Sequence, residues 1–468
     1  MTPAQSRDGG GTVPPSDPAQ PDPGPRSDAT SVVPRWSVTP GIAYGAAAAV
    51  LLAGLALVLG RAELALVAAP LFFAVALGYD RRPNRFAPVS VRTVLDPDQD
   101  ATGVRYRVTI DAPPEVEAVS LMMFAADHSV HRVAVDRRTA AGTDRAPGAP
   151  SLSGRIPVAH SGPQEILRLH YSLLAGAGIA LSSPDDGPES TRLIPPPRLR
   201  IENLPMPLRV VGITGAHGSA TPGDGGEFRD VALFAPGDRL RRIDWKVTAR
   251  RAQLPGDLYV RRSFSTADAL VMLVVDDRDE LGSDVTSWTG TEGGTPTATS
   301  LDLAREAALS LASAYIDAGD RVGFRDLAGT ARSVEPGGGT RHLDRLRSTI
   351  ATAAPTGDPV KSVRTPVVPS SAVVVVVSTF LDDLAATMAI TWASTGHRVV
   401  AIDVLPQPEV KHATREEQTA FRLVMLERND RIDGMTAAGV EPVRWQPLPG
   451  DPVPAVQLRM LSRPRRRR

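Results

Sequence analysis

The run ALVMLVVDD (269–277) is apolar without interruption until it ends in two acids. This pattern is typical of a parallel strand that is buried on both faces and carries its functional loop at the carboxyl end. A polar loop follows, and then SLDLAREAALSLASAYIDAG (300–319), in which apolar residues recur at intervals of three and four. That spacing predicts a helix, so strand and helix alternate from this point of the chain.

The alternation continues downstream. It predicts strands over 320–328, 331–336, 371–380, 397–405 and 440–445, and helices over 340–353, 381–396 and 415–439. A break in the last helix at Asp433 and Gly434 is one alternative. We therefore expect an α/β domain over 265–450, a doubly wound sheet with helices on both faces. Residues 451–468 end in RPRRRR and are predicted to form a basic tail, either solvated or bound to anionic membrane lipid.

Upstream of the α/β domain lies an arginine-rich stretch, PGDRLRRIDWKVTARR (236–251). Leu240, Ile243 and Val247 fall on one helical stripe, which predicts that the stripe packs and that Trp245 is half-buried. We expect carboxylate–arginine pairs here, with Asp238 and Asp244 as acceptors and Arg241, Arg250 or Arg261 as donors. We interpret residues 206–264 as an insert that docks a second domain onto the α/β domain. A partner-docking surface is the alternative.

Residues 86–205 alternate with a period of two between breaks rich in proline and glycine. In GVRYRVTIDA (103–112), for example, Val104, Tyr106, Val108 and Ile110 fall on one face. Several short strands of this kind predict a small antiparallel β-sandwich. The stretch IPPPRLRIENLPMP (194–207) is typical of an extended connector.

Two long apolar runs precede the sandwich. GIAYGAAAAVLLAGLALVLG (41–60) has no charge and would extend about 30 Å as a helix, the thickness of a bilayer core, and LALVAAPLFFAVALGY (64–79) is the second run. We predict two transmembrane helices over 40–80, with a soluble helical hairpin as the alternative. The flanking arginines predict that both ends lie in the cytoplasm, in the cytoplasmic (inner) membrane; these are Arg35, Arg81, Arg82 and Arg85. Residues 1–38, rich in Pro, Gly, Ser and Asp, are predicted to be disordered.

Composition and missing motifs reduce the number of function classes that fit this chain. The 52 basic residues balance 52 acidic ones, which disfavours a dedicated nucleic-acid binder. The chain has no cysteine, so disulfides and thiolate chemistry are excluded. It also has no phosphate-binding glycine motif and no hydrolase or zinc-protease motif. Ser378 follows a predicted strand, but no neighbour in the sequence would activate it. We therefore expect neither an enzyme nor a nucleotide cofactor.

The arginine-rich stretch and the region after it resemble the bacterial family called domain of unknown function 58. The residues that match its signature are Gly237, Asp238, Arg241, Ile243, Trp245, Lys246, Ala249 and Arg250, whereas its arginine and tyrosine fall at Ala232 and Phe234. The resemblance implies a von Willebrand factor A-like domain that binds proteins through the loops 276–284, 337–340 and 378–382. It also implies a MoxR-type AAA+ ATPase as partner and a transglutaminase-like membrane protein as a further companion.

The resemblance also raises the question of a metal site. A working von Willebrand A domain carries Asp-x-Ser-x-Ser after its first strand and a threonine from a later loop. Here Arg278 and Glu280 replace the serines, and an arginine repels a divalent cation. Nearby carboxylates could still rebuild an oxygen site for Mg²⁺. The candidate ligands are Asp276, Asp279 and Thr340.

Together these observations predict a membrane-anchored protein-interaction module with a degenerate von Willebrand A-type site, which helps a MoxR-type ATPase to assemble or activate other complexes. The alternatives are a metal-independent envelope scaffold and a hydrolase. The candidate interaction residues are Gly237, Asp238, Arg241, Asp244, Trp245, Lys246 and Arg250.

Overall fold

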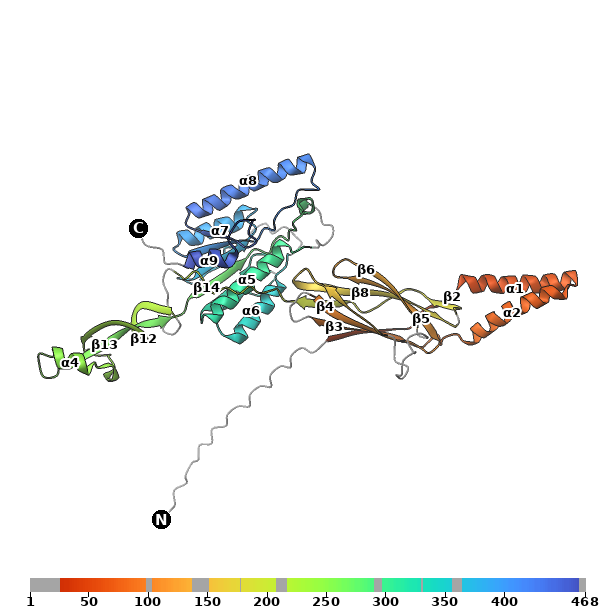
Figure 1. Ribbon diagram of the computed structural model, residues 1–468, viewed down its shortest axis with the longest axis horizontal. Helices are drawn as coiled ribbons and strands as arrows, with labels where there is room; N and C mark the ends of the chain where they lie inside the picture. Colours follow the sequence, from red (N-terminus) through yellow and green to blue (C-terminus); the bar gives the residue numbers. More distant parts are fainter. Residues whose placement is uncertain are drawn as a thin grey trace, which may run out of the picture.

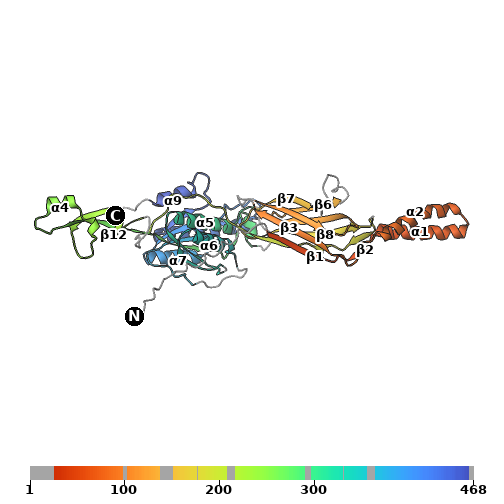
Figure 2. The ribbon, with the colours of Figure 1, turned by 90° about the horizontal axis from the view of Figure 1, so that it is seen from below.

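The computed structural model describes residues 26–97, 103–136, 151–176, 178–207, 217–289, 297–329, 331–355 and 364–462. The molecule is elongated, and four parts follow one another along its length (Figures 1 and 2). They are a helical hairpin, a β-sandwich, an α/β domain and a two-stranded arm. The mixture of α and β structure that the sequence predicts is confirmed.

The hairpin consists of α1 (Pro40–Leu59) and α2 (Ala62–Asp80). Both helices are long and apolar enough to cross a membrane. Their large apolar side chains face outward, and Leu57, for example, is 86 % exposed. The tight connection begins at Gly60, whose φ of 63° lies in the left-handed region that glycine adopts without strain. The soluble alternative requires a buried hairpin, and these helices are not buried within the described residues.

The hairpin is fixed to the sandwich at the base of both helices. The Thr39 amide donates to the carbonyl of Ile179 at 2.8 Å, and the Thr39 hydroxyl donates to the carbonyl of Gly178 at 2.8 Å. On α2, a Cβ at Gly78 would lie 1.6 Å from Cδ1 of Ile179. Only glycine therefore lets the end of α2 approach this loop.

The sandwich has two antiparallel sheets around one apolar core. The first contains, in spatial order, β1 (Arg26–Val32), β3 (Val89–Pro97), β4 (Gly103–Asp111) and β7 (Ser151–Pro157). The second contains, in order, β2 (Trp36–Val38), β9 (Ala180–Ser182), β8 (Gly162–Ala175), β5 (Val116–Ala125) and β6 (Val130–Asp136). The short strands β10 (Asp185–Asp186) and β11 (Ser190–Ile194) also pair with β8. The predicted alternation is confirmed, because Val104, Val108 and Ile110 are buried and Tyr106 packs against the same core.

The prediction that residues 1–38 are disordered is wrong for 26–38. β1 pairs with β3 over seven residues, and β2 pairs with β9. The segment RSDATSV has few apolar residues, so its place in a sheet comes from the backbone ladder with β3 rather than from its own composition. Residues 1–25 lie outside the described part of the chain.

The α/β domain has a six-stranded sheet. Its strands in spatial order are β16 (Val334–Gly337), β15 (Arg321–Asp326), β14 (Leu270–Val275), β17 (Val373–Ser378), β18 (Arg398–Asp403) and β19 (Glu441–Arg444). All neighbours run parallel except β16, which is antiparallel to β15. The order of the strands reverses between β14 and β17, and ligand sites of open α/β sheets form at such a point.

Helices cover both faces of this sheet (Figure 1). One face packs against α5 (Ser300–Asp317), α6 (Thr340–Thr352) and α9 (Pro454–Ser462). The other packs against α7 (Asp383–Ser394) and α8 (Arg415–Ala437). Within β14, Val271, Leu273 and Val275 face the first group, whereas Met272 and Val274 face the second. The continuous apolar run at 269–277 follows from burial on both faces.

Two details at the carboxyl end of the chain differ from expectation. The last long helix, α8, is continuous through Asp433 and Gly434. The predicted basic tail at 451–468 is wrong for 454–462, which form α9 and bury Leu458 in the core. The α/β domain therefore extends beyond 450, and the stretch RPRRRR at 463–468 lies outside the described residues.

The arm consists of β12 (His217–Leu233) and β13 (Tyr259–Ala267), an antiparallel pair. Residues 235–258, here called the tip, join the two strands and contain the 3₁₀ turn η1 (Leu240–Arg242) and the helix α4 (Trp245–Arg251). The arm projects from the α/β domain at the end opposite the hairpin (Figures 1 and 2). The interpretation of residues 206–264 as an insert that docks a second domain onto the α/β domain is therefore wrong.

A different set of residues joins the sandwich to the α/β domain. The carboxylate of Asp302 on α5 accepts from the amide and the hydroxyl of Ser161, at 2.7 and 2.9 Å, and lies 2.6 Å from Nδ1 of His160. Arg305, one turn later, donates to the carbonyl of Ser161 at 2.6 Å and to that of Ala353 at 2.6 Å. We call these contacts the joint.

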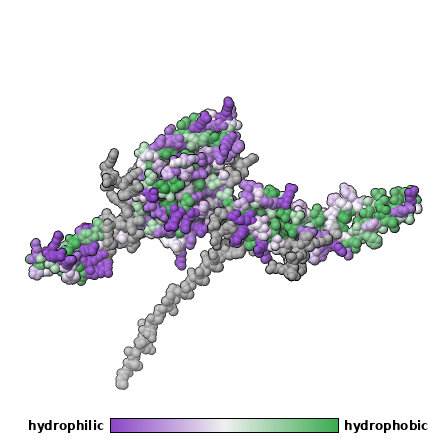
Figure 3. All heavy atoms as spheres, viewed as in Figure 1, coloured by the Kyte–Doolittle hydropathy of each residue, from purple (hydrophilic) through white to green (hydrophobic). Residues whose placement is uncertain are grey.

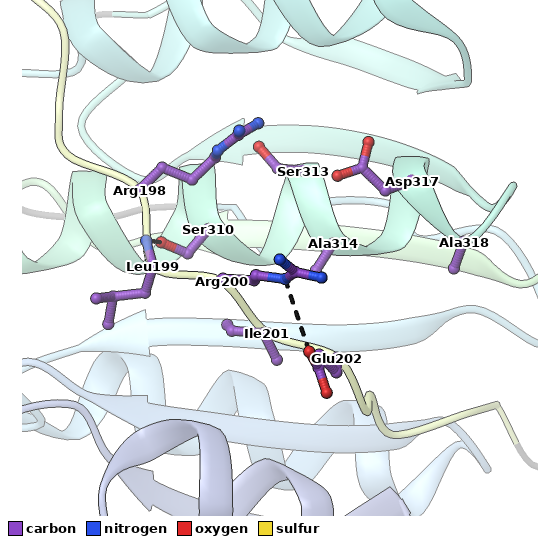
Figure 4. A pocket seen from close by; sticks show the side chains of 10 residues that line it. All are labelled: Arg198, Leu199, Arg200, Ile201, Glu202, Ser310, Ser313, Ala314, Asp317 and Ala318. Carbon is purple, nitrogen blue, oxygen red and sulfur yellow. Dashed lines mark hydrogen bonds and ion pairs between the residues drawn. The ribbon is translucent and has the colours of Figure 1, made fainter.

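The predicted connector continues from the joint along α5. Residues 195–207 form neither helix nor strand, and the amide of Leu199 donates to the hydroxyl of Ser310 at 2.9 Å. Figure 4 shows this segment beside α5, where the two enclose an open groove of about 600 Å³. Further along, the buried Tyr315 hydroxyl donates to the carbonyl of Pro205 at 2.7 Å. The connector thus positions the α/β domain on the sandwich.

Candidate functional site

The loops after β14 and β17 meet where the strand order reverses, and we call residues 276–280 and 378–382 the carboxyl edge. Asp276 follows β14, and its amide donates to the carbonyl of Val377 at 2.8 Å. The hydroxyl of Ser378, the last residue of β17, donates to Oδ2 of Asp276 at 2.7 Å. Adjacent parallel strands therefore bring together two polar side chains that are 102 positions apart in sequence.

Arg278 fills the space between the two loops. Its Nε and Nη2 donate to the two carboxylate oxygens of Asp276 at 2.7 and 2.9 Å. Its Nη1 and Nη2 donate to the two oxygens of Asp382 at 2.6 and 2.9 Å. One guanidinium thus makes bidentate pairs with two carboxylates, a geometry to which its planar fork of donors is suited.

The charges at the carboxyl edge stabilise one another. Burial lowers the pKa of Arg278, but the hydrogen bonds with Asp382 and Asp276 outweigh it, so the pKa lies well above its ordinary value. Burial raises the pKa of Asp382, and its contacts with Arg278 more than offset this, which leaves a lowered pKa. Side chains of Arg278 and Asp276 are only 11 % and 8 % exposed. The guanidinium of Arg278 is therefore a built-in cation of the carboxyl edge.

The structure does not bring the predicted metal ligands together. Asp276 is held by Arg278 and Ser378, whereas Asp279 is exposed at the rim of the loop. Within the described ranges, no group of three or more histidine, aspartate or glutamate side chains could hold a metal ion. The described side chains at the carboxyl edge fit a guanidinium better than a divalent cation, because Arg278 takes the oxygens that a cation would need.

Thr340 lies at the opposite end of the sheet from Asp276. β16 runs antiparallel, so it returns the chain to the level of Val322, which pairs with Gly337 and with Val271 at the start of β14. Asp276 is five residues further along, roughly 15 Å at the rise of a strand. The prediction that Thr340 shares a site with Asp276 is wrong, as is the prediction that loop 337–340 belongs to the same contact surface. The sequence pattern could not show that β16 is an antiparallel edge strand.

The tip holds the signature residues, and its acids are used to build it. Asp238 accepts from the amide of Ala235 at 2.9 Å and pairs with Arg262 of β13 at 2.8 Å. Asp244 is the N-cap of α4 and accepts from the amide of Val247 at 3.0 Å. Gly237 has a φ of 99°, which an L side chain rarely adopts. The signature thus specifies a particular turn at the end of the arm.

The expected contacts of this stretch differ from the observed ones. Trp245 is 67 % exposed rather than half-buried, and Leu240 is 69 % exposed. The expected stripe does not form, because the helix breaks between Arg242 and Trp245. Asp238 pairs with Arg262 instead of Arg241, Arg250 or Arg261. The basic signature side chains are exposed at the tip; these are Arg241, Lys246 and Arg250.

Two sets of structural residues were missed from the sequence. Asp382 follows β17 in the stretch STFLDD. Its position could have been predicted, because an acid that follows a buried strand lies at the carboxyl edge. For the joint residues, the sequence indicated only that Thr299 and Asp302 form a capping box at the start of α5. Nothing in the pattern indicated that Asp302 would also bind His160 and Ser161, which come from a different domain.

Residues 230–413 match the model of a family described as a protein of unknown function, DUF58. This part of the chain is similar to DUF58, and we call residues 230–413 the DUF58 region. The DUF58 region includes the end of β12, the whole tip, β13 and the α/β domain through β18. The family that the sequence resemblance predicted is confirmed.

Relatives of this chain occur in mycobacteria. The chain is 29 % identical over 223 residues to an uncharacterized protein of Mycobacterium bovis, and equally to one of Mycobacterium tuberculosis. The match covers 46 % of this chain and 66 % of each relative. The chain thus spans about two thirds of the length of these relatives, and the hairpin and the whole sandwich precede the DUF58 region.

Proposed function

We propose that the protein is a membrane-anchored protein-interaction module without catalytic activity, and that its α/β domain is von Willebrand factor A-like. The observation that carries this proposal is the arrangement along the molecule's length (Figures 1 and 2). Two apolar helices lie at one end, and the DUF58 region, with its carboxyl edge and its exposed arm, lies at the other. A spacer of this kind would place a binding domain at a fixed distance from a bilayer.

The anchoring proposal rests on the hairpin and its flanking charges. Both helices would cross the inner membrane, and Arg35, Arg81, Arg82 and Arg85 favour the cytoplasm for the sandwich side. β1 and β3, which flank the hairpin in sequence, pair in one sheet, so both outer ends of the hairpin meet the same domain. The DUF58 region would then face the cytoplasm. The basic chain end at 463–468 is a further proposed contact for anionic lipid.

The carboxyl edge supports a von Willebrand A-type interaction site that works without a metal. Asp276 and Ser378 occupy the ends of the two central strands, where such domains hold a cation, and Arg278 supplies the positive charge instead. The exposed side chains Asp279 and Glu280 lie at its rim. We infer a preassembled protein-binding surface that needs neither Mg²⁺ nor another cofactor.

The proposed partner is a MoxR-type AAA+ ATPase, with a transglutaminase-like membrane protein as a second companion, and nucleic acid is not expected to bind. This part of the proposal comes from the family resemblance. The module would hold the ATPase near the membrane while it assembles or activates another complex.

The test uses the full chain in a lipid nanodisc and a purified MoxR-type ATPase from the same genome. We expect the ATPase to bind, and Asp279→Lys to weaken binding, because it reverses a charge at the carboxyl edge. Asp430→Lys, an equally exposed change on α8, is the matched control. Absence of binding, or equal loss with both variants, would contradict the proposal. A titration with MgCl₂ should leave the Tm of the wild-type protein unchanged.

A further inference from the structure

We propose that the tip of the arm is a second docking surface, whose partner is a protein that presents an apolar face flanked by acidic side chains. This surface is separate from the carboxyl edge. The apolar side chains of the tip, its charge, its rigidity and its position in the molecule support this partner.

The tip exposes three large apolar side chains that its own fold does not use. Leu240, Trp245 and Leu254 are 69 %, 67 % and 69 % exposed. Neither η1 nor α4 contains a buried residue. Figure 3 shows hydrophobic and hydrophilic residues intermixed at this end of the molecule. Large apolar side chains that are exposed within one short segment are typical of interaction sites, and tryptophan is among the residues enriched where binding energy is concentrated.

The tip is also strongly basic. It contains six arginine or lysine residues and three aspartates. All three aspartates are engaged within the turn: Asp238 with Ala235 and Arg262, Asp244 with Val247, and Asp257 with the amides of Gln253 and Leu254. Among the described residues, no ion pair or hydrogen bond engages the side chains of Arg241, Lys246, Arg250 or Arg251. Their positive charge is therefore available to an acidic partner.

The tip is held in one shape before any partner binds. The amide of Asp244 donates to the carbonyl of Tyr259 at 2.8 Å, and the amide of Tyr259 donates to the Thr248 hydroxyl at 2.9 Å. Together with the Asp238–Arg262 pair, these bonds tie α4 and the preceding turn to β13. A surface that is already ordered loses little conformational entropy on binding, which raises affinity.

The other ligands that a basic surface could take fit less well. The tip lies at the end of the molecule opposite the hairpin, so it cannot reach the bilayer that holds the hairpin (Figures 1 and 2). Single-stranded nucleic acid is bound by stacking on several aromatic rings, and the tip has only Trp245. A second copy of the tip would bring like charges together. An acidic protein surface with an apolar face is complementary both to the charge of the tip and to its exposed tryptophan and leucines.

The experiment measures binding of defined probes to the full chain in a nanodisc of neutral lipid. The main probe is a fluorescent helical peptide whose binding face carries glutamate and leucine. The second is the same peptide with serine in place of leucine. A single-stranded oligonucleotide and vesicles that contain phosphatidylglycerol are the third and fourth. We expect the glutamate–leucine peptide to bind, and the serine peptide to bind at least about tenfold more weakly.

Variants locate the binding site. Trp245→Ala and Arg250→Glu should each reduce the affinity for the glutamate–leucine peptide about tenfold or more, whereas Trp245→Phe retains most of it. Arg422→Glu and Leu423→Ala, equivalent changes of exposed residues on α8, should have no effect. An unchanged Tm shows that each variant is folded. The edge variant Asp279→Lys should bind the peptide normally, which separates this proposal from the proposed function.

Several results would overturn the proposal. They are absence of peptide binding, equal binding of the serine peptide, and insensitivity to both tip variants. Tighter binding of the oligonucleotide or of the anionic vesicles would do the same, as would self-association that depends on Trp245. Each of these outcomes would assign the tip to a different ligand or to none.

Discussion

Arg278 illustrates how one residue can change the chemistry of a site without changing its architecture. The strands deliver Asp276 and Ser378 to the same place at the carboxyl edge, and the side chain two positions after Asp276 decides what occupies the space between them. A guanidinium there forms four hydrogen bonds with two carboxylates. Since it is covalently attached, it cannot dissociate as a bound ion can.

The first prediction concerns this side chain. Arg278→Ser removes the counter-charge of Asp276, which is 8 % exposed, and should lower the free energy of unfolding by about 3 kcal/mol. It also restores the first serine of the Asp-x-Ser pattern. Millimolar MgCl₂ should therefore raise the Tm of the variant and not that of the wild type. If Arg278→Met, which cannot bind a cation, responds to MgCl₂ equally, the ion acts elsewhere.

A second prediction at this scale concerns Asp302 and pH. Burial raises the pKa of Asp302, but hydrogen bonds with His160, Thr299 and Ser161 outweigh burial, so the folded pKa lies below the ordinary value. Its stabilising contribution is thus complete above the unfolded pKa and is lost as pH falls through the folded one. Asp302→Asn should cost about 2 kcal/mol near neutral pH, because Arg305 loses its counter-charge.

The pH dependence distinguishes the loss of the Asp302 charge from a simple packing defect. The difference in Tm between wild type and Asp302→Asn should shrink as the pH is lowered below about 4, where the wild-type carboxylate becomes protonated. Glu416→Gln, at an exposed position on α8, is the control and should show no such trend. A Tm difference that stays constant at every pH would contradict a role for the charge of Asp302.

Among the described elements, the arm contributes no side chain to the three apolar cores. It is a two-stranded ribbon, and such a ribbon is only marginally stable unless other bonds support it. Here the bonds of Asp238, Asp244 and Thr248 hold the tip, while its large apolar side chains stay in solvent. An element that is maintained in this way contributes a surface to the molecule rather than stability.

This view gives the third prediction. The amide of Phe234 donates to the carbonyl of Leu258 at 2.7 Å, so the two strands are already paired at the base of the tip. Replacement of residues 235–257 by Asn-Gly should close the ribbon and change the Tm by no more than about 2 °C. By contrast, Gly162→Ala at the joint should lower the Tm clearly, because its Cβ would lie 2.7 Å from Cζ of Arg305. A large loss of stability on removal of the tip would show that it packs against the core.

The elements themselves could be read from the sequence to a large extent, because each depends on local periodicity. The strands and helices of the α/β domain lie where the pattern places them, and so do the two apolar helices of the hairpin. Contacts between distant residues could not be read. Neither the antiparallel direction of β16 nor the pairing of β1 with β3 leaves a trace in composition, and the first of these removes Thr340 from the carboxyl edge.

At the scale of the whole molecule, the linear order of parts determines what can reach the membrane. The hairpin, sandwich, α/β domain and arm follow one another (Figure 2). The prediction that the stretch 236–251 docks two domains onto each other was wrong because its local charge pattern is compatible with both an interface and a free surface. Only the path of β12 and β13 away from the other domains decides between the two.

The fourth prediction is the topology. The chain has no cysteine, so a single introduced thiol reports its own location. Arg61→Cys, between the two helices, should react with a membrane-impermeant maleimide on intact cells. Asp430→Cys, exposed on α8, should react only after lysis. Labelling of Asp430→Cys on intact cells would place the DUF58 region outside the cytoplasm, and protection of both would mean that the hairpin does not span the bilayer.

The pairing of β1 with β3 has a consequence for biogenesis. Residues 26–32 leave the ribosome before both helices, whereas their partner at 89–95 leaves after them. In the proposed topology, the first strand stays unpaired while the hairpin enters the bilayer, and the sandwich closes only once the chain has returned to the side on which it started. A hairpin inserted with only one crossing would leave β1 and β3 in different compartments. Correct folding of the sandwich would therefore depend on correct insertion of the hairpin.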